Sequence, residues 1–247
     1  MSKLMVFHGS DHKCGTTQIA QCTAESLAAD FPASKILLVF ADGGRGSEYC
    51  EGVRESVERI RPYLKEDLLN PDEILGKSLY RDNLYIIGGN DDPLNAESFS
   101  PDMSMMLMRV LRDYFDVCII DSGANAISSG LSLGSLFSSD RIYMLLSQKE
   151  SSLRNFEWNR YMYEKLKITP DVFIINDYDK SNPYSRKYIS DRLNICLDEL
   201  FTVAHHSRGF ECEMNRKSLI SERPGKAFMR DIKNLAKDVA EYADLQS

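Results

Sequence analysis

Short apolar runs alternate with longer amphipathic stretches along this sequence, and that alternation narrows its fold to one class. The runs are near-continuous in apolar and β-branched residues, as in parallel strands buried on both faces. They are Leu4–Phe7, Ile36–Phe40, Leu84–Ile87, Val117–Ile120, Ile142–Leu146, Val172–Ile175 and Leu200–Val203. The stretches between them have helical period, as in Thr17–Ala29, Met103–Tyr114 and Leu153–Leu166. Strands alternating with helices imply right-handed crossovers. We therefore predict an α/β fold: one doubly wound, mainly parallel sheet of about seven strands with helices on both faces.

Length and composition favour one cytosolic globular domain spanning residues 1–247. No linker rich in Pro, Gly or Ser divides the chain, although 45–83 departs from the pattern, with helical segments around Pro62 and Pro71.

The net charge of −7 argues against a surface that holds nucleic acid by bulk electrostatics. No apolar run approaches the ~20 residues that cross a bilayer, and the first run is too short for a signal peptide. The cysteines lack C-x-x-C spacing, which suggests reduced thiols. Trp158 lies at helical spacing and is expected to pack.

The first apolar run leads into an altered phosphate-binding loop. Residues 9–17 read Gly-Ser-Asp-His-Lys-Cys-Gly-Thr-Thr and open onto a helical stretch. A P-loop would read G-x-x-x-x-G-K-[ST] here. Gly9 and Thr16 fit that frame, but Cys14 stands in the glycine slot and Gly15 in the lysine slot. The site therefore distinguishes an ATPase from a protein with an ATPase's fold and altered chemistry.

The helix after this loop would still offer free backbone N–H groups and a positive dipole end, which suit a phosphate. Thr16 offers a hydroxyl for magnesium, and Thr17 offers a second hydroxyl. The missing lysine would have neutralised charge between the outer phosphates, and Lys13 lies two positions too early. The alternative is a tight strand-to-helix turn without a ligand.

Polar residues that follow three other runs are further candidates, because ligands of such sheets bind beyond the carboxyl ends of the strands. Asp42 follows the second run and could orient a water or help to hold magnesium, or it could be a turn residue. Asp121 ends the fourth run before a Ser-Gly pair, which is the pattern of a Walker B strand whose carboxylate binds the magnesium shell. Asn176 ends the sixth run, where its amide could hydrogen-bond a purine edge.

Together these positions resemble the ParA/MinD family of deviant-Walker-A ATPases. The family loop K-G-G-x-G-K-T-T corresponds to Ser10–Thr17, and the strand ending D-x-D corresponds to Ile36–Asp42. Asp116–Gly123 is similar to the family's Y-D-x-x-I-I-D-[TS] strand, and Ile174–Asn176 to the strand whose Asn faces adenine. The resemblance covers most of the chain in the right order. It implies a P-loop NTPase fold that binds ATP or ADP with Mg²⁺.

The resemblance also assigns site residues. The implied nucleotide-binding residues are Gly9, Ser10, Lys13, Cys14, Gly15, Thr16, Thr17 and Asn176. The implied magnesium ligands are Thr16, Asp42 and Asp121, and Asp42 would orient a water or the magnesium in an active enzyme.

Three positions depart from the family pattern together. The signature lysine is Ser10, the P-loop lysine is Gly15, and the first carboxylate of D-x-D is Phe40. Losing only the lysines would leave a buried carboxylate without its partner, so the joint loss suggests compensation. Removing such charges lowers rates by orders of magnitude. We therefore expect a degenerate ATP site, with catalysis impaired and hydrolysis weak or absent.

The resemblance is nearest to the TadZ/CpaE branch, which assembles pili at a cell pole, although members of that branch commonly carry an N-terminal receiver-like domain. It implies a cytoplasmic localisation or assembly factor that reaches a membrane or pole through protein partners, and a homodimer is compatible with it. Two alternatives stay open. One is an active ATPase with a rewired loop that uses Lys13, and the other is a nucleotide-free interaction scaffold.

Overall fold

The computed structural model describes residues 2–46, 49–66, 69–92, 99–127 and 129–246. Its centre is a sheet whose strands are β1 (Lys3–Gly9), β2 (Ile36–Phe40), β3 (Glu55–Ser56), β4 (Leu79–Arg81), β5 (Leu84–Gly88), β6 (Val117–Asp121), β7 (Arg141–Ser147), β8 (Val172–Tyr178) and β9 (Leu200–Ala204). The helices are α1 (Thr16–Asp30), α2 (Val57–Lys65), α3 (Pro71–Ser78), α4 (Pro101–Leu111), α5 (Gly130–Ser138), α6 (Glu150–Leu166), α7 (Arg186–Leu193), α8 (Gly209–Asn215) and α9 (Lys226–Tyr242), with a 3-10 turn η2 at Leu197–Glu199.

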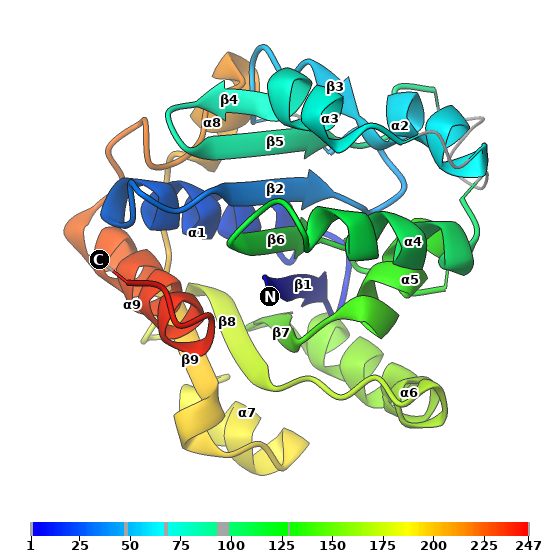
Figure 1. The fold of residues 1–247 in the computed structure, drawn as a ribbon. Helices are drawn as coiled ribbons and strands as arrows, with labels where there is room; N and C mark the ends of the chain where they lie inside the picture. The colour runs from blue at the N-terminus through cyan, green and yellow to red at the C-terminus, as the bar shows by residue number, and fades with distance from the viewer. Residues whose placement is uncertain (1, 47–48, 67–68, 93–98, 128, 247) are drawn as a thin grey trace.

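The strands are ordered β3-β5-β2-β6-β1-β7-β8-β9, and β1 lies in the middle (Figure 1). Every pair along this path is parallel, and β4 joins β5 antiparallel. All seven predicted runs are strands, so the predicted fold class is confirmed. The prediction of about seven strands was too low, because β3 and β4 are only two and three residues long and carry no apolar run.

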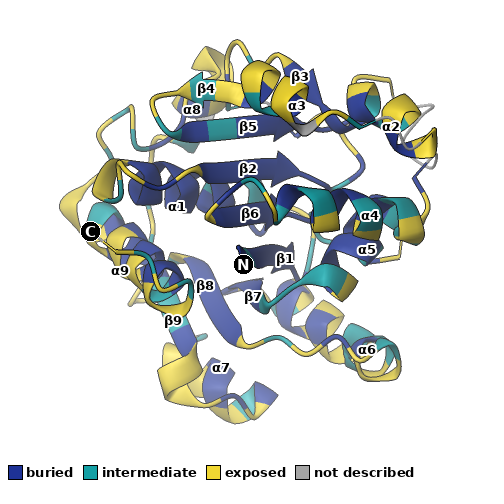
Figure 2. Cartoon of the chain, viewed as in Figure 1, coloured by how far each residue is buried: buried dark blue, intermediate teal, exposed yellow. Residues whose placement is uncertain are grey.

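Helices cover both faces of the sheet, because side chains of successive strand residues point to opposite faces. Leu4 and Val6 of β1 belong to the core cluster that α2 to α7 cover, while Met5 and Phe7 belong to the cluster on the other face, which α1, α8 and α9 cover. In Figure 2 the strands other than β4 are largely buried, whereas β4 and the outer sides of the helices are exposed. Trp158 contradicts the sequence prediction, since it is 85% exposed on α6 and does not pack.

Serine side chains fix where several helices begin. Ser56, Ser100, Ser129 and Ser185 accept hydrogen bonds from first-turn N–H groups of α2, α4, α5 and α7. Such caps satisfy donors that lack an intrahelical partner. Helix α1 begins after Gly15 with no side-chain cap, which matters for the site below. In the described part of the chain, no helix is both long and apolar enough to span a bilayer.

Candidate functional site

The altered loop connects the end of β1 to the start of α1. Its first backbone bonds fix it to neighbouring strands: Ser10 N–H donates to the Leu145 carbonyl at 2.9 Å, and Gly9 N–H donates to the Gly123 carbonyl at 2.7 Å. The first i→i−4 bond of α1 runs from Ile19 N–H to the Gly15 carbonyl. The earlier N–H groups of α1 therefore have no acceptor in the helix, and the positive end of its dipole is uncapped. This arrangement suits an anion.

Gly15, in the lysine slot, has a backbone that a lysine would not adopt without strain. Its φ of 83° lies in the left-handed region, where a side chain costs roughly 1–2 kcal/mol. A Cβ at this position would lie 2.2 Å from Nδ2 of Asn176. The same Nδ2 donates to the Cys14 carbonyl at 2.9 Å. The Asn176 amide therefore occupies the space that a side chain at Gly15 would need.

Ser10, in the signature-lysine slot, is turned into the protein. It is 2% exposed, and its hydroxyl lies 2.8 Å from the Ser152 hydroxyl in the first turn of α6. Ser152 also accepts from Ser147 N–H at 2.9 Å, and the Cys14 thiol lies 3.6 Å from the Ser10 hydroxyl. These contacts hold the buried side of the loop against the first turn of α6.

Two carboxylates stand at the carboxyl ends of β6, which neighbours β1, and of β2, which is the next strand beyond β6. Asp121 is fully buried at the end of β6, and its Oδ1 accepts from Gly123 N–H at 3.1 Å. Asp42 is half-buried after β2, and its Oδ1 accepts from Gly44 N–H at 2.9 Å. Burial raises the pKa of Asp42, and the Gly44 N–H partly opposes that rise. A Cβ on Gly123 would lie 2.7 Å from the Asp42 Cβ, so these segments touch.

Phe40 occupies the slot of the first D-x-D carboxylate. Its side chain is fully buried in the core on the α1 face. A Cβ on Gly46 would lie 2.3 Å from the Phe40 Cβ, so the following loop folds tightly over the ring. This slot is therefore filled by packed apolar atoms.

A cleft of about 420 Å³ lies beside the loop and the start of α1. The predicted residues that line it are Lys13, Gly15, Thr16, Thr17 and Asp42. The other predicted residues lie outside its lining, and Ser10, Cys14, Asp121 and Asn176 are buried. A volume of this size is ordinary for a small-ligand site. The predicted contact between Asn176 and a purine remains a prediction, but its amide nitrogen is already bonded to the loop.

Sequence reasoning missed several residues of the cleft. Gln18, Tyr49, Asn125 and Glu213 contribute to its lining along with Asp11 and His12. Glu213 comes from α8, near the other end of the chain from the loop. With Asp11 and Asp42, it gives the cleft three carboxylates beside Lys13.

A buried hydrogen-bond network lies directly behind the loop. His8 is fully buried, with Nδ1 2.9 Å from the Ser122 hydroxyl and Nε2 3.1 Å from the Tyr163 hydroxyl. Ser122 donates to the Phe7 carbonyl, so it accepts from Nδ1–H, and Nε2 accepts from Tyr163. Burial lowers the pKa of His8 to about 4 and raises the pKa of Tyr163 to about 12. The imidazole is therefore neutral and ties β1 to α6 and to the end of β6.

Comparison with solved structures gives this architecture a name. A ParA family ATPase from Chlorobium tepidum TLS superposes with a TM-score of 0.83 at 15% identity, covering 96% of this chain and 99% of that chain. The chain has the fold of the ParA/MinD P-loop ATPases. MinD from Pyrococcus horikoshii OT3, complexed with Mg-ADP, matches with a TM-score of 0.79 at 15% identity, covering 100% and 99%.

The MinC:MinD complex of Aquifex aeolicus has a TM-score of 0.74 at 14% identity, covering 96% of each chain. No protein-family model and no curated protein sequence matches this chain. Identities this low carry the fold alone, so the chemistry of the cleft must be argued from its residues.

Proposed function

We propose that this chain is a ParA/MinD-like nucleotide-binding protein with a degenerate Walker A loop, and that it serves as a localisation or assembly factor. It would bind ATP or ADP with Mg²⁺ and hydrolyse ATP slowly or not at all. The observation that carries this proposal is Gly15, since its left-handed backbone strains any side chain and a Cβ there would lie 2.2 Å from the Asn176 amide nitrogen.

The remaining groups fit a phosphate and a magnesium ion. The uncapped N–H groups of α1 and the ammonium of Lys13 would face the phosphates, and the Thr16 hydroxyl would be the protein's direct ligand to magnesium. Bound magnesium would neutralise phosphate charge that a lysine usually shares. Asp42 would orient a water in the cleft. Asp121, which is buried next to the cleft, would bind the magnesium shell. The MinD structure with Mg-ADP supports a nucleotide as the ligand of this fold.

The first test measures binding and turnover together. Calorimetric titration with Mg-ADP and Mg-ATP should give saturable binding, and phosphate release should be at least about 100-fold slower than for a lysine-containing ATPase of this fold assayed in parallel. The exposed control Asp113→Ala should bind nucleotide and release phosphate as the parent does. Turnover at the rate of the lysine-containing enzyme, abolished by Asp42→Ala alone, would contradict the proposal.

An active ATPase with a rewired loop is the second candidate, favoured by one observation. Lys13 has a φ of 65° and lines the cleft with Thr16 and Asp42. If its ammonium replaces the missing lysine, Lys13→Ala should weaken Mg-ATP binding roughly 10- to 100-fold, the range for a hydrogen bond to a charged group. The exposed Lys180→Ala is the matched control. Equal affinity of both variants and the parent would remove this candidate.

A nucleotide-free scaffold is the third candidate, and a thermal-shift measurement distinguishes it. Ligand at fifty times its Kd should stabilise the native protein by about 2 kcal/mol. No shift with millimolar Mg-ATP or Mg-ADP would favour the scaffold. We place the chain nearest the TadZ/CpaE pilus-assembly branch on the sequence resemblance alone. Capture of pilus-assembly proteins by the tagged chain in its own cells would support that placement, and their absence would count against it.

A further inference from the structure

A second cleft lies between α2 and α3, away from the loop of β1, and has a volume of about 360 Å³. Its floor is apolar, since Ile60 and Ile74 are buried side chains of the core. Leu69 is partly buried beside them, and Pro62 and Tyr63 form an exposed wall. A concave apolar floor of this size, with polar and charged side chains around it, is compatible with a small-molecule site.

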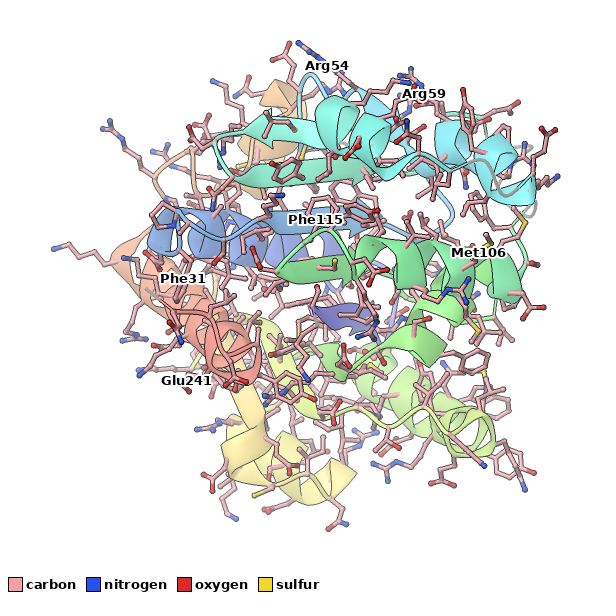
Figure 3. The ribbon with its side chains drawn as sticks, in the orientation of Figure 1. Phe31, Arg54, Arg59, Met106, Phe115 and Glu241 are labelled. Carbon is pink, nitrogen blue, oxygen red and sulfur yellow. The ribbon has the colours of Figure 1, made fainter. Side chains whose placement is uncertain are left out.

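Two arginines stand at this cleft. Arg54 and Arg59 both line it and are both exposed, and Figure 3 shows them at the same end of the molecule as α2 and α3. Arg59 donates from Nη1 to the Arg54 carbonyl, which fixes one guanidinium near the backbone of the other. Within the described ranges of the chain, neither guanidinium forms an ion pair with a carboxylate.

The other charged groups of the cleft are already engaged. Lys77 pairs with Glu73 one helical turn away. Glu55 is 5% exposed, and its Oε1 accepts from Ser56 N–H at 3.0 Å. A neutral N–H does not cancel the charge of Glu55, so Arg54, Arg59 and Lys77 against Glu55 and Glu73 leave the lining with an excess of one positive charge. An Arg guanidinium binds carboxylates and similar anions with directed, charge-assisted hydrogen bonds.

We propose that this cleft is a second binding site, independent of the loop cleft, for a small amphiphilic anion: a medium-chain or aryl acid. The apolar body would lie on Ile60 and Ile74, and the anionic group would reach Arg54 and Arg59 at the rim. The cleft has neither a glycine-rich loop nor an uncapped helix start, because α2 is capped by Ser56 and α3 by Asn70. A nucleotide phosphate therefore has no cradle here, and the apolar floor selects a hydrocarbon or ring.

The probe for this site is anilinonaphthalene sulfonate, which combines aromatic rings with one anionic group. The folded chain should bind it saturably at a single site with enhanced fluorescence, and decanoate should displace it. Replacing both arginines, Arg54→Gln with Arg59→Gln, should weaken binding at least about ten-fold. The control pair Arg109→Gln with Arg216→Gln removes the same charge from exposed positions outside the cleft and should bind as the parent does. Equal binding by the Arg54/Arg59 variant and the parent would overturn the proposal.

Two further measurements locate the ligand. Tyr63→Trp in a Trp158→Phe background places the only tryptophan on the wall of the cleft, and decanoate should change its emission over the concentrations that displace the dye. An unchanged emission would place the ligand elsewhere and refute the site. Mg-ADP should not displace the dye. Displacement by Mg-ADP would assign the dye to the loop cleft, whereas failure of Mg-ADP to bind at all would count only against the nucleotide proposal.

Discussion

Replacing Gly15 by alanine tests the central structural reasoning, because the added methyl group meets two separate obstacles. The left-handed backbone at φ 83° costs a residue with a Cβ roughly 1–2 kcal/mol. The methyl carbon would also lie 2.2 Å from the Asn176 amide nitrogen, which must then leave the Cys14 carbonyl. Both residues are buried, so that lost bond costs about 1–3 kcal/mol. Gly15→Ala should therefore destabilise the protein by about 2–5 kcal/mol, a large part of a typical domain's stability.

A double-mutant cycle separates the two obstacles. Asn176→Ala alone should cost about 1–3 kcal/mol, since it leaves the Cys14 carbonyl without its donor. In that background the steric conflict is gone, and Gly15→Ala should cost only the backbone strain of about 1–2 kcal/mol. The double variant should thus be more stable than the sum of the single effects predicts, by about 1–3 kcal/mol. Urea unfolding followed by circular dichroism measures each midpoint, with the m-value unchanged. Additive effects, or a cost of Gly15→Ala near zero, would refute the reasoning.

Three other predictions concern the same region. Measured by urea unfolding, Ser10→Ala should lower the free energy of unfolding by about 1 kcal/mol, because it removes the hydrogen bond to Ser152. Ser10→Lys should lower it by about 3 kcal/mol or more, because the lysine must bury its charge or pull the loop away from Ser152. Equal stability of the two variants would mean that the loop opens freely. The pKa of His8 is about 6.5 in the unfolded chain and about 4 in the folded protein, so the unfolded chain binds the proton first as the pH falls. Acidification from pH 6.5 to 4 should therefore reduce the free energy of unfolding by about 3 kcal/mol. In His8→Gln the free energy of unfolding should change less with pH over this window. An unchanged slope would place the titration elsewhere. Glu213→Gln should raise the affinity for Mg-ADP about two- to five-fold, more at low salt, because it removes one carboxylate from the cleft; titration calorimetry at two salt concentrations checks this, and a weaker affinity would show that Glu213 contacts the ligand favourably.

The fold could be predicted because seven strands of this sheet are near-continuous apolar runs in the sequence. Ile36–Phe40 and Val117–Asp121 are buried on both faces, so hydrophobicity alone marks them. Glu55–Ser56 carries no such mark, since it pairs with β5 at the sheet edge through two residues. Its pairing depends on tertiary contacts that a local pattern does not contain. The prediction that Trp158 packs was wrong, because helical spacing identifies a helix but does not say which face of that helix is covered.

Only part of the candidate site could be predicted from the sequence, because some of its residues come from segments that no local pattern connects. Lys13, Thr16 and Asp42 are close to strand ends along the chain, so the topology rule for parallel sheets brings them to one edge. Glu213 reaches the same cleft only after the chain has returned through β9 and α8, which no local spacing encodes. The contact between Asn176 and Gly15 depends on a left-handed backbone, and a glycine in the sequence permits that conformation without announcing it.

The central place of β1 constrains how the chain is made. Its two neighbours in the sheet begin at Val117 and Arg141, so β1 cannot pair until the chain between it and Val117 has been made. Pairings between distant segments fold slowly, and the unpaired strand meanwhile exposes a fully apolar stretch, Leu4–Phe7. The loop that follows β1 is anchored by Leu145, Ser152 and Asn176, which emerge later still. The nascent chain therefore cannot form the cleft early, and any ligand of the cleft can stabilise only the completed sheet.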